Sequence, residues 1–147
     1  MKPNALLLAT LLTIFLTACQ SHSGRSSEPI ELGDYKWELV ALNGQAIQLS
    51  QARETPHLIF LEAEQRIAGS TGCNRIMGSY ELTDKGHIHF GQLATTRMAC
   101  PDMETEAAFW DALNNYDGAQ FERGSFSLLN AAGERIARFV AKPLEVQ

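Results

Sequence analysis

Apolar and polar residues alternate with a period of two in many short stretches after residue 32, and this pattern predicts β-strands. The stretch YKWEL at 35–39 is the first of them, and Asn43-Gly44 after it predicts a tight hairpin turn. Further strands are predicted at 46–49, 57–62, 66–70, 80–83, 87–90, 119–122, 125–129 and 134–141. We therefore expect about eight short strands separated by turns.

The stretch from Tyr80 to Phe90 predicts a hairpin with a turn at Asp84-Lys85-Gly86. The residues expected to face the core are Tyr80, Leu82, Ile88 and Phe90. His87 and His89 are two positions apart, so they are expected on the opposite face. A metal site would need a third ligand, and none stands nearby in the sequence. We interpret the two histidines as solvent-facing strand residues and predict no metal site.

Helical periodicity occurs only once, after Pro101. Proline suits a first helical turn, and Asp102, Glu104 and Glu106 complement the positive end of the helix dipole. The residues at helical spacing are Met103, Ala107, Trp110, Leu113 and Tyr116, with Phe109 beside them. We predict that this stripe packs on the core and that the helix ends within 114–118.

Many short strands and one helix predict a mainly β, α+β fold: an antiparallel, barrel-like and highly curved sheet, with the helix across one open end or one face. The folded domain is expected at 32–143, with a short tail at 144–147. The aromatic residues expected in the core are Trp37, Phe60, Tyr80, Phe90, Trp110, Phe121, Phe126 and Phe139. A barrel of this size is either filled by side chains or holds one small ligand, and the sequence leaves both open.

Residues 1–18 have the features of an export signal: Lys2 near the start and then the apolar run ALLLATLLTIFL. This run is shorter than the ~20 residues of a membrane-spanning helix. Leu16-Thr17-Ala18-Cys19 resembles a bacterial lipoprotein signal, in which Cys19 becomes the lipidated first residue. Gln20 rather than Asp after this cysteine favours sorting to the outer membrane. The serine-rich stretch 19–31 is interpreted as a lipid-bearing flexible tether.

The formal net charge of −5 changes the list of expected partners. Binding of nucleic acid needs clustered lysines and arginines, so we expect no nucleic-acid partner. Attraction to an anionic lipid surface by charge is disfavoured for the same reason. Attachment to a membrane must then come from the lipid on Cys19.

Two short motifs carry a family resemblance: Gly72-Cys73-Asn74-Arg75, and TTRMAC at 95–100 before the acidic helix. Together with Trp37-Glu38-Leu39 they resemble the META domain, and within it the HslJ type of bacterial heat-shock lipoprotein. The resemblance covers roughly 34–141. It implies a small barrel-like fold on the periplasmic side of the outer membrane, a role in envelope stress and, for the HslJ type, a link to novobiocin resistance.

The resemblance implies no reaction, and the sequence contains no phosphate-binding loop, nucleophile elbow or zinc-protease motif. We therefore expect a non-enzymatic protein without a cofactor, which protects or supports the envelope through protein or small-ligand contacts. Two alternatives stay open. One is a barrel that binds a small apolar molecule, and the other is an accessory or pilot protein of an envelope machine.

Cys73 and Cys100 are the remaining thiols once Cys19 is lipidated, and they would face an oxidising periplasm. We predict a disulfide between them, with two buried free cysteines as the alternative. A reactive thiol is disfavoured, because there is no Cys-x-x-Cys motif. Asn74 is expected to bind backbone groups or adopt a positive φ. Arg75 and Arg97 could bind an anionic ligand or pair with the helix acids at 102, 104 and 106.

Overall fold

The computed structural model describes residues 31–49, 54–83, 86–101 and 103–144. These residues form ten strands, one α-helix and one short 3-10 helix. In chain order they are β1 (Tyr35–Leu42), β2 (Gln45–Ala46), β3 (His57–Leu61), η1 (Glu62–Glu64), β4 (Arg66–Ser70), β5 (Arg75–Leu82), β6 (Ile88–Phe90), β7 (Ala94–Thr95), α1 (Met103–Asn114), β8 (Gly118–Glu122), β9 (Ser125–Leu129) and β10 (Arg135–Pro143). The predicted mainly β fold with one α-helix is confirmed.

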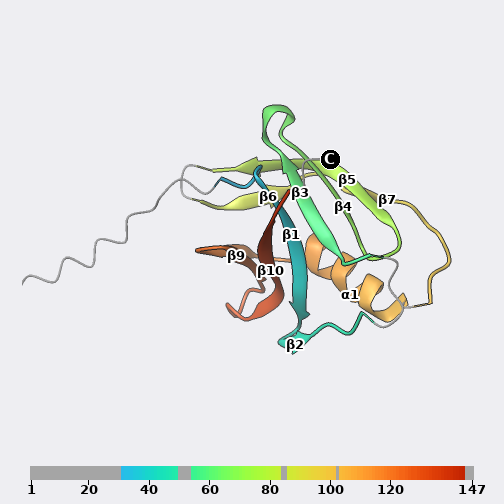
Figure 1. The fold of residues 1–147 in the computed structure, drawn as a ribbon. Helices are drawn as coiled ribbons and strands as arrows, with labels where there is room; N and C mark the ends of the chain where they lie inside the picture. The colour runs from blue at the N-terminus through green and yellow to red at the C-terminus, as the bar shows by residue number, and fades with distance from the viewer. Residues whose placement is uncertain (1–30, 50–53, 84–85, 102, 145–147) are drawn as a thin grey trace, which may run out of the picture.

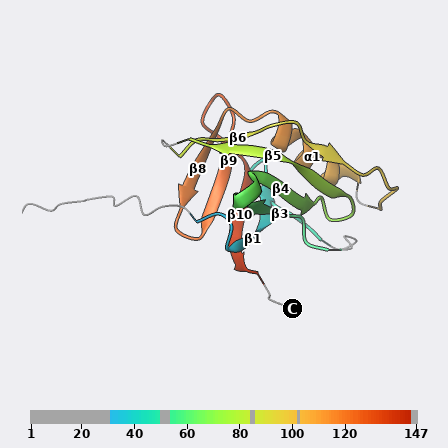
Figure 2. The ribbon, with the colours of Figure 1, turned by 90° about the horizontal axis from the view of Figure 1, so that it is seen from above.

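Eight strands follow one another in a single antiparallel sheet, in the order β6-β5-β4-β3-β1-β10-β9-β8. The short strands β2 and β7 pair with β1 and β5 beside this path. Figures 1 and 2 show that the sheet curls on itself into a nearly closed barrel. The two end strands, β6 and β8, are not paired with each other in the part of the chain that the structure describes. We call this opening the β6–β8 seam.

The pairing is irregular where β1 meets β10, the C-terminal strand. Their pairing shifts register between Leu39 and Ala41, so Val40 is an extra residue in β1. A second shift lies between Arg135 and Ala137, where β10 pairs with β9. An extra residue of this kind bends a strand and increases its twist, and so helps a sheet of short strands to close on itself.

The interior of the barrel is filled by side chains. Trp37 packs edge-on against Phe126, with 5.1 Å between the ring centroids. Phe126 stacks on Phe139 at 4.4 Å, and Phe60 packs on Tyr80 at 4.9 Å. Such aromatic pairs add to the hydrophobic stabilisation that burial provides. Among the aromatic residues predicted for the core, Trp110 and Phe121 are only partly buried and pack at its edge.

The helix α1 lies across one end of the barrel. Phe109 is fully buried and contacts Phe139 of β10, while Glu106 reaches toward the start of β5. The predicted stripe was wrong in part, since Met103 is 56% exposed and Ala107 is also exposed. The helical residues that are buried are Phe109, Ala112 and Leu113.

The hairpin of β5 and β6 is confirmed, with Tyr80 opposite Phe90 and both side chains buried. Leu82 was expected in the core but is 40% exposed, because it lies at the end of β5 beyond the packed interior. Two other strand boundaries were wrong. The strand expected at 46–49 is limited to β2, and β5 already begins at Arg75, within a segment for which no strand was predicted.

The export signal, Cys19, the tether up to residue 30 and the tail at 145–147 lie outside the described residues. Within the described ranges, no helix combines the length and the apolar character that crossing a bilayer requires.

Candidate functional site

A disulfide joins Cys73, in the turn between β4 and β5, to Cys100, just before α1. The two Cα atoms lie 6.2 Å apart, within the usual range for a disulfide. The predicted pairing is confirmed, and the alternative of two free cysteines is excluded. The bond fixes the segment leading into the helix to the turn between β4 and β5.

Asn74 is buried, with 1% of its surface exposed, and it binds the segment that carries Cys100. Its Oδ1 accepts hydrogen bonds from the Met98 backbone N–H and the Thr96 hydroxyl, each at 2.8 Å. Its Nδ2 donates to Glu106 Oε1 at 2.6 Å and to the Met98 carbonyl at 3.3 Å. The prediction that Asn74 binds backbone groups is confirmed, while the positive φ is not observed.

The carboxylate of Glu106 is the second centre of this network. Its Oε1 accepts the bond from Asn74, and its Oε2 is buried with no hydrogen-bond partner in the described parts of the chain. Glu106 lies in the first turn of α1, where the helix dipole stabilises a negative charge. Asn74, Glu106 and the disulfide therefore act together to dock the helix.

Arg75 and Arg97 are exposed and lie outside this network. They flank Thr96, whose hydroxyl accepts a hydrogen bond from the Arg75 backbone N–H. Neither guanidinium forms an ion pair with a residue that the structure describes. The alternative that they pair with Glu104 or Glu106 is not observed, and Glu106 binds Asn74 instead. Asp102 lies outside the described residues.

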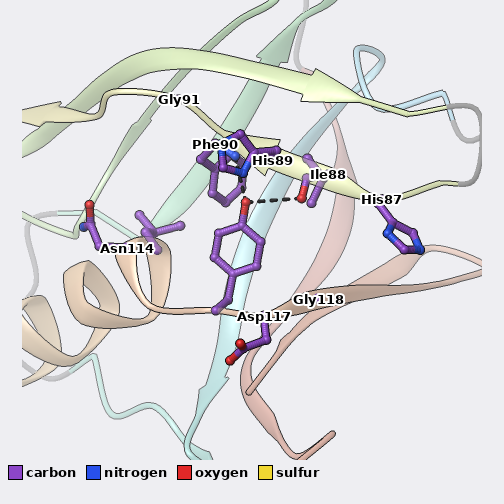
Figure 3. A pocket seen from close by; sticks show the side chains of 10 residues that line it. His87, Ile88, His89, Phe90, Gly91, Asn114, Asp117 and Gly118 are labelled. Carbon is purple, nitrogen blue, oxygen red and sulfur yellow. Dashed lines mark hydrogen bonds between the residues drawn. The ribbon is translucent and has the colours of Figure 1, made fainter. Parts of the chain in front are cut away.

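A pocket of about 410 Å³ opens at the β6–β8 seam, away from the cysteine motif. Residues from β6, from the end of α1 and from the start of β8 line it (Figure 3). They are His87, Ile88, His89, Phe90, Gly91, Leu113, Asn114, Tyr116, Asp117 and Gly118. Its volume lies within the range of pockets that bind small molecules. We take this pocket as the candidate functional site.

Tyr116 bridges the pocket from the α1–β8 connection to β6. Its hydroxyl accepts a hydrogen bond from the Phe90 backbone N–H at 2.7 Å and donates to the Ile88 carbonyl at 3.2 Å. Dashed lines in Figure 3 mark these bonds. Burial raises the pKa of the Tyr116 phenol, and the hydrogen bond from Phe90 opposes that rise. A neutral phenol can both donate and accept, as this bridge requires.

His87 and His89 are both exposed, as their spacing predicted, and both lie at the pocket. Asp117 also lines it, and its exposed carboxylate forms no ion pair within the described ranges. Figure 3 shows Asn114 at the helix end of the pocket and His87 at the far end. No group of three or more histidine, cysteine or acidic side chains suited to a metal ion occurs in the described part of the chain.

Sequence reasoning missed the pocket because its main residue was assigned to the wrong place. Tyr116 was expected on the core face of the helix, but α1 ends at Asn114 and the side chain crosses to β6. The available signal was an aromatic residue with a hydroxyl group just after a helix end. This signal alone does not predict which residues the hydroxyl binds.

The sequence matches the META domain family over residues 30–143. A comparison with curated proteins found no match.

Two solved structures are similar to this chain. The first is the NMR structure of a protein from Burkholderia xenovorans, with 33% identity and a TM-score of 0.57, over 76% of this chain and 83% of that one. The second is the crystal structure of a DUF4847 family protein from Bacteroides vulgatus, with 16% identity and a TM-score of 0.54, over 78% of this chain and 97% of that one. At 16% identity, the similarity to the second structure concerns the fold alone. On the family match over residues 30–143, the chain belongs to the META domain family.

Proposed function

We propose that this protein is a non-enzymatic lipoprotein, anchored through Cys19 on the periplasmic side of the bacterial outer membrane, with a protective role of the HslJ type in envelope stress. The observation that carries the proposal is the order of parts along the chain: the lipoprotein motif at 16–19 is followed by a short serine-rich stretch and then by the META domain. An acyl chain contributes about 0.8 kcal/mol per buried CH₂, so more than one chain gives a stable anchor.

The roles of the motif residues support a non-enzymatic reading. Cys73 and Cys100 are bound to each other, so neither presents a thiolate. Asn74 uses both atoms of its side-chain amide within the fold. The docking of α1 thus accounts for Cys73, Asn74 and Cys100 of the family motif, while Arg75 and Arg97 remain exposed, so function is better sought at the surface.

The filled interior favours action through the surface rather than through a ligand enclosed in the barrel. The aromatic cluster that contains Phe60, Phe126 and Phe139 occupies the space such a ligand would need. The pocket at the β6–β8 seam is open at the rim and is lined by polar groups, including Asp117 and two histidines. This observation favours the second candidate function, an accessory partner of another envelope protein.

The proposal is tested by complementation of a strain that lacks the gene, scored as growth under envelope stress and novobiocin. The wild-type chain is expected to restore growth and to label with a fatty acid. Cys19→Ala paired with an ordinary cleavable signal is expected to reach the periplasm, to stay unlabelled and to fail in protection. Full protection by this soluble variant would contradict the need for an anchor.

A matched variant addresses the surface arginines. Arg75→Ala with Arg97→Ala removes two exposed charges that form no ion pair with described residues, so the fold is expected to be unchanged. If protection acts through the seam, this variant complements as wild type does. Loss of protection would move the functional surface to the region around Arg75 and Arg97.

A further inference from the structure

The free edge of β6 presents backbone groups of only two residues to the seam. The Thr83 N–H donates to the His87 carbonyl, so the backbone groups of His87 point toward β5. Backbone groups alternate along a strand, and those of Ile88 and Phe90 therefore point away from β5. Both side chains are buried in the core, with 4% and 6% exposed, so these two residues hold the edge in place.

Tyr116 occupies the position of a missing strand. In a parallel ladder, one residue of the neighbouring strand donates to the carbonyl of residue i−1 and accepts from the N–H of residue i+1. The Tyr116 hydroxyl donates to Ile88 and accepts from Phe90, which is the same pair of groups around His89. One side chain thus forms two of the hydrogen bonds that a neighbouring strand would form with the backbone of β6.

We propose that the β6–β8 seam accepts an extended segment of a partner protein, which adds as a strand beside β6, displaces the Tyr116 hydroxyl and places a Lys or Arg side chain at Asp117. This inference rests on the proposed function, in which the protein acts through its surface in the cell envelope, and it adds that the partner supplies an extended segment with a basic residue. Addition of a strand to an exposed sheet edge is an established mode of peptide recognition.

The exposed negative charges around the seam are the reason for expecting a Lys or Arg in the bound segment. Asp117 lines the pocket with an exposed carboxylate that has no ion pair among the described residues. Glu81 lies directly opposite His89 in the β5–β6 register and adds a second exposed negative charge. Arg135 does not offset these charges, because it is paired with Glu122 at 2.9 Å.

The hydrogen-bond balance permits the exchange. The segment replaces the two bonds of one hydroxyl with backbone bonds to the same two groups, Ile88 and Phe90, and it can also reach their remaining outward groups. The phenol of Tyr116 is half-buried beside an open pocket, so the displaced hydroxyl can bind water. The exchange therefore leaves neither the Tyr116 hydroxyl nor the two backbone groups that it binds without a hydrogen bond, so its free-energy cost is small.

Titration of the ¹⁵N-labelled full chain in detergent micelles with synthetic peptides tests the proposal by NMR. The probes are seven-residue peptides of alternating Thr and Val, in which one Lys is moved from end to end. We expect saturable shifts of the Phe90 and Gly118 amides and slower exchange of the Ile88 amide. Methylation of every second backbone nitrogen of the peptide, on the edge that faces β6, is expected to abolish binding. The peptide then lacks the N–H groups that would donate to the carbonyls of β6.

Variants of the protein make the result specific. Tyr116→Phe is expected to tighten binding about twofold to tenfold, because it removes a competitor worth one typical hydrogen bond. Asp117→Asn is expected to weaken binding of the Lys peptides about twofold to fivefold, the size of an exposed ion pair. Tyr35→Phe is the control, because that tyrosine lies on β1, away from the seam. The affinity of this variant for the peptides is expected to match that of the wild type.

The proposal is overturned if no peptide gives saturable shifts with either wild-type or Tyr116→Phe protein, or if the N-methylated peptides bind equally well. The second outcome would mean that the pocket holds side chains and that no strand is added. Neither outcome affects the lipid anchor or the protective role, which the complementation experiment tests separately.

Discussion

The side-chain amide of Asn74 donates a 2.6 Å hydrogen bond to Oε1 of Glu106, and this bond joins the turn before β5 to the first turn of α1. The oxygen of the same amide accepts hydrogen bonds from Met98 and Thr96, so one buried side chain binds two segments that are more than 20 positions away from it in sequence. Its central place in the family motif is explained by this structural role.

Replacement of Asn74 by Ala is expected to lower the free energy of unfolding by about 3 kcal/mol, because several buried partners lose their bonds at once. Urea unfolding followed by tryptophan fluorescence measures the change. Asn115→Ala is the matched control, because Asn115 makes one exposed bond to Asp111, and its loss is expected to cost less than about 0.5 kcal/mol. A cost below about 1 kcal/mol for Asn74→Ala would contradict the structural role.

The β-hairpin illustrates what the sequence determines well. Tyr80, Ile88 and Phe90 were placed in the core from alternation alone, because one buried face fixes the period of a strand. The same argument placed both histidines outside. Leu82 was misplaced because alternation gives the face of a residue, while its distance from the end of the sheet decides whether anything covers it.

The helix shows why the rest was harder to predict. Its inward-facing stripe runs from the half-buried Glu106 through the buried Phe109 and Leu113, at helical spacing, but a carboxylate at the first position does not register as apolar. Only the presence of Asn74, 32 residues away in sequence, makes Glu106 a core-facing residue. The pocket at the seam was missed for a similar reason, since Tyr116 and β6 meet only in the folded barrel.

Removal of the disulfide tests the second connection to α1. The double variant Cys73→Ser with Cys100→Ser is expected to lose about 3–4 kcal/mol of stability, because the bond closes a loop across 27 positions and restricts the unfolded chain. Urea unfolding with and without a reductant measures the effect, and the reductant is expected to change the wild type alone. Two alkylatable thiols at Cys73 and Cys100 without reduction, detected by mass spectrometry, would rule the bond out.

Gly69 is expected to tolerate no side chain. A Cβ at this position of β4 would lie 2.2 Å from the backbone carbonyl oxygen of His57 in β3, so the two strands would have to separate. Gly69→Ala is therefore expected to destabilise the protein by about 2–3 kcal/mol. Gly118→Ala is the control, because no atom lies within 4 Å of its added Cβ, and its stability is expected within about 0.5 kcal/mol of wild type. Equal thermal midpoints for the two variants would contradict the close approach of β3 and β4.

Tyr116→Phe is expected to change how stability depends on alkaline pH. Burial raises the pKa of this phenol in the folded state above the value of about 10 in an unfolded chain. The folded state therefore holds the proton more tightly, so the stabilisation is complete below pH ~10 and is lost as the pH rises through the folded pKa. Urea midpoints measured from pH 8 to pH 11 are expected to fall less steeply for Tyr116→Phe than for wild type.

Part of the alkaline dependence is expected to remain in that variant. Burial, followed by the nearby charge of Glu62, also raises the pKa of Tyr80, so this second phenol destabilises the folded state on ionisation in the same way. Tyr80→Phe combined with Tyr116→Phe is therefore expected to flatten the profile further than either change alone. Below pH 9, Tyr116→Phe is expected to cost only about 1 kcal/mol, because water in the open pocket can bind the Ile88 and Phe90 groups that the hydroxyl releases. An unchanged alkaline slope in the single variant would show that the Tyr116 phenol is solvated and does not bridge the β6–β8 seam in solution.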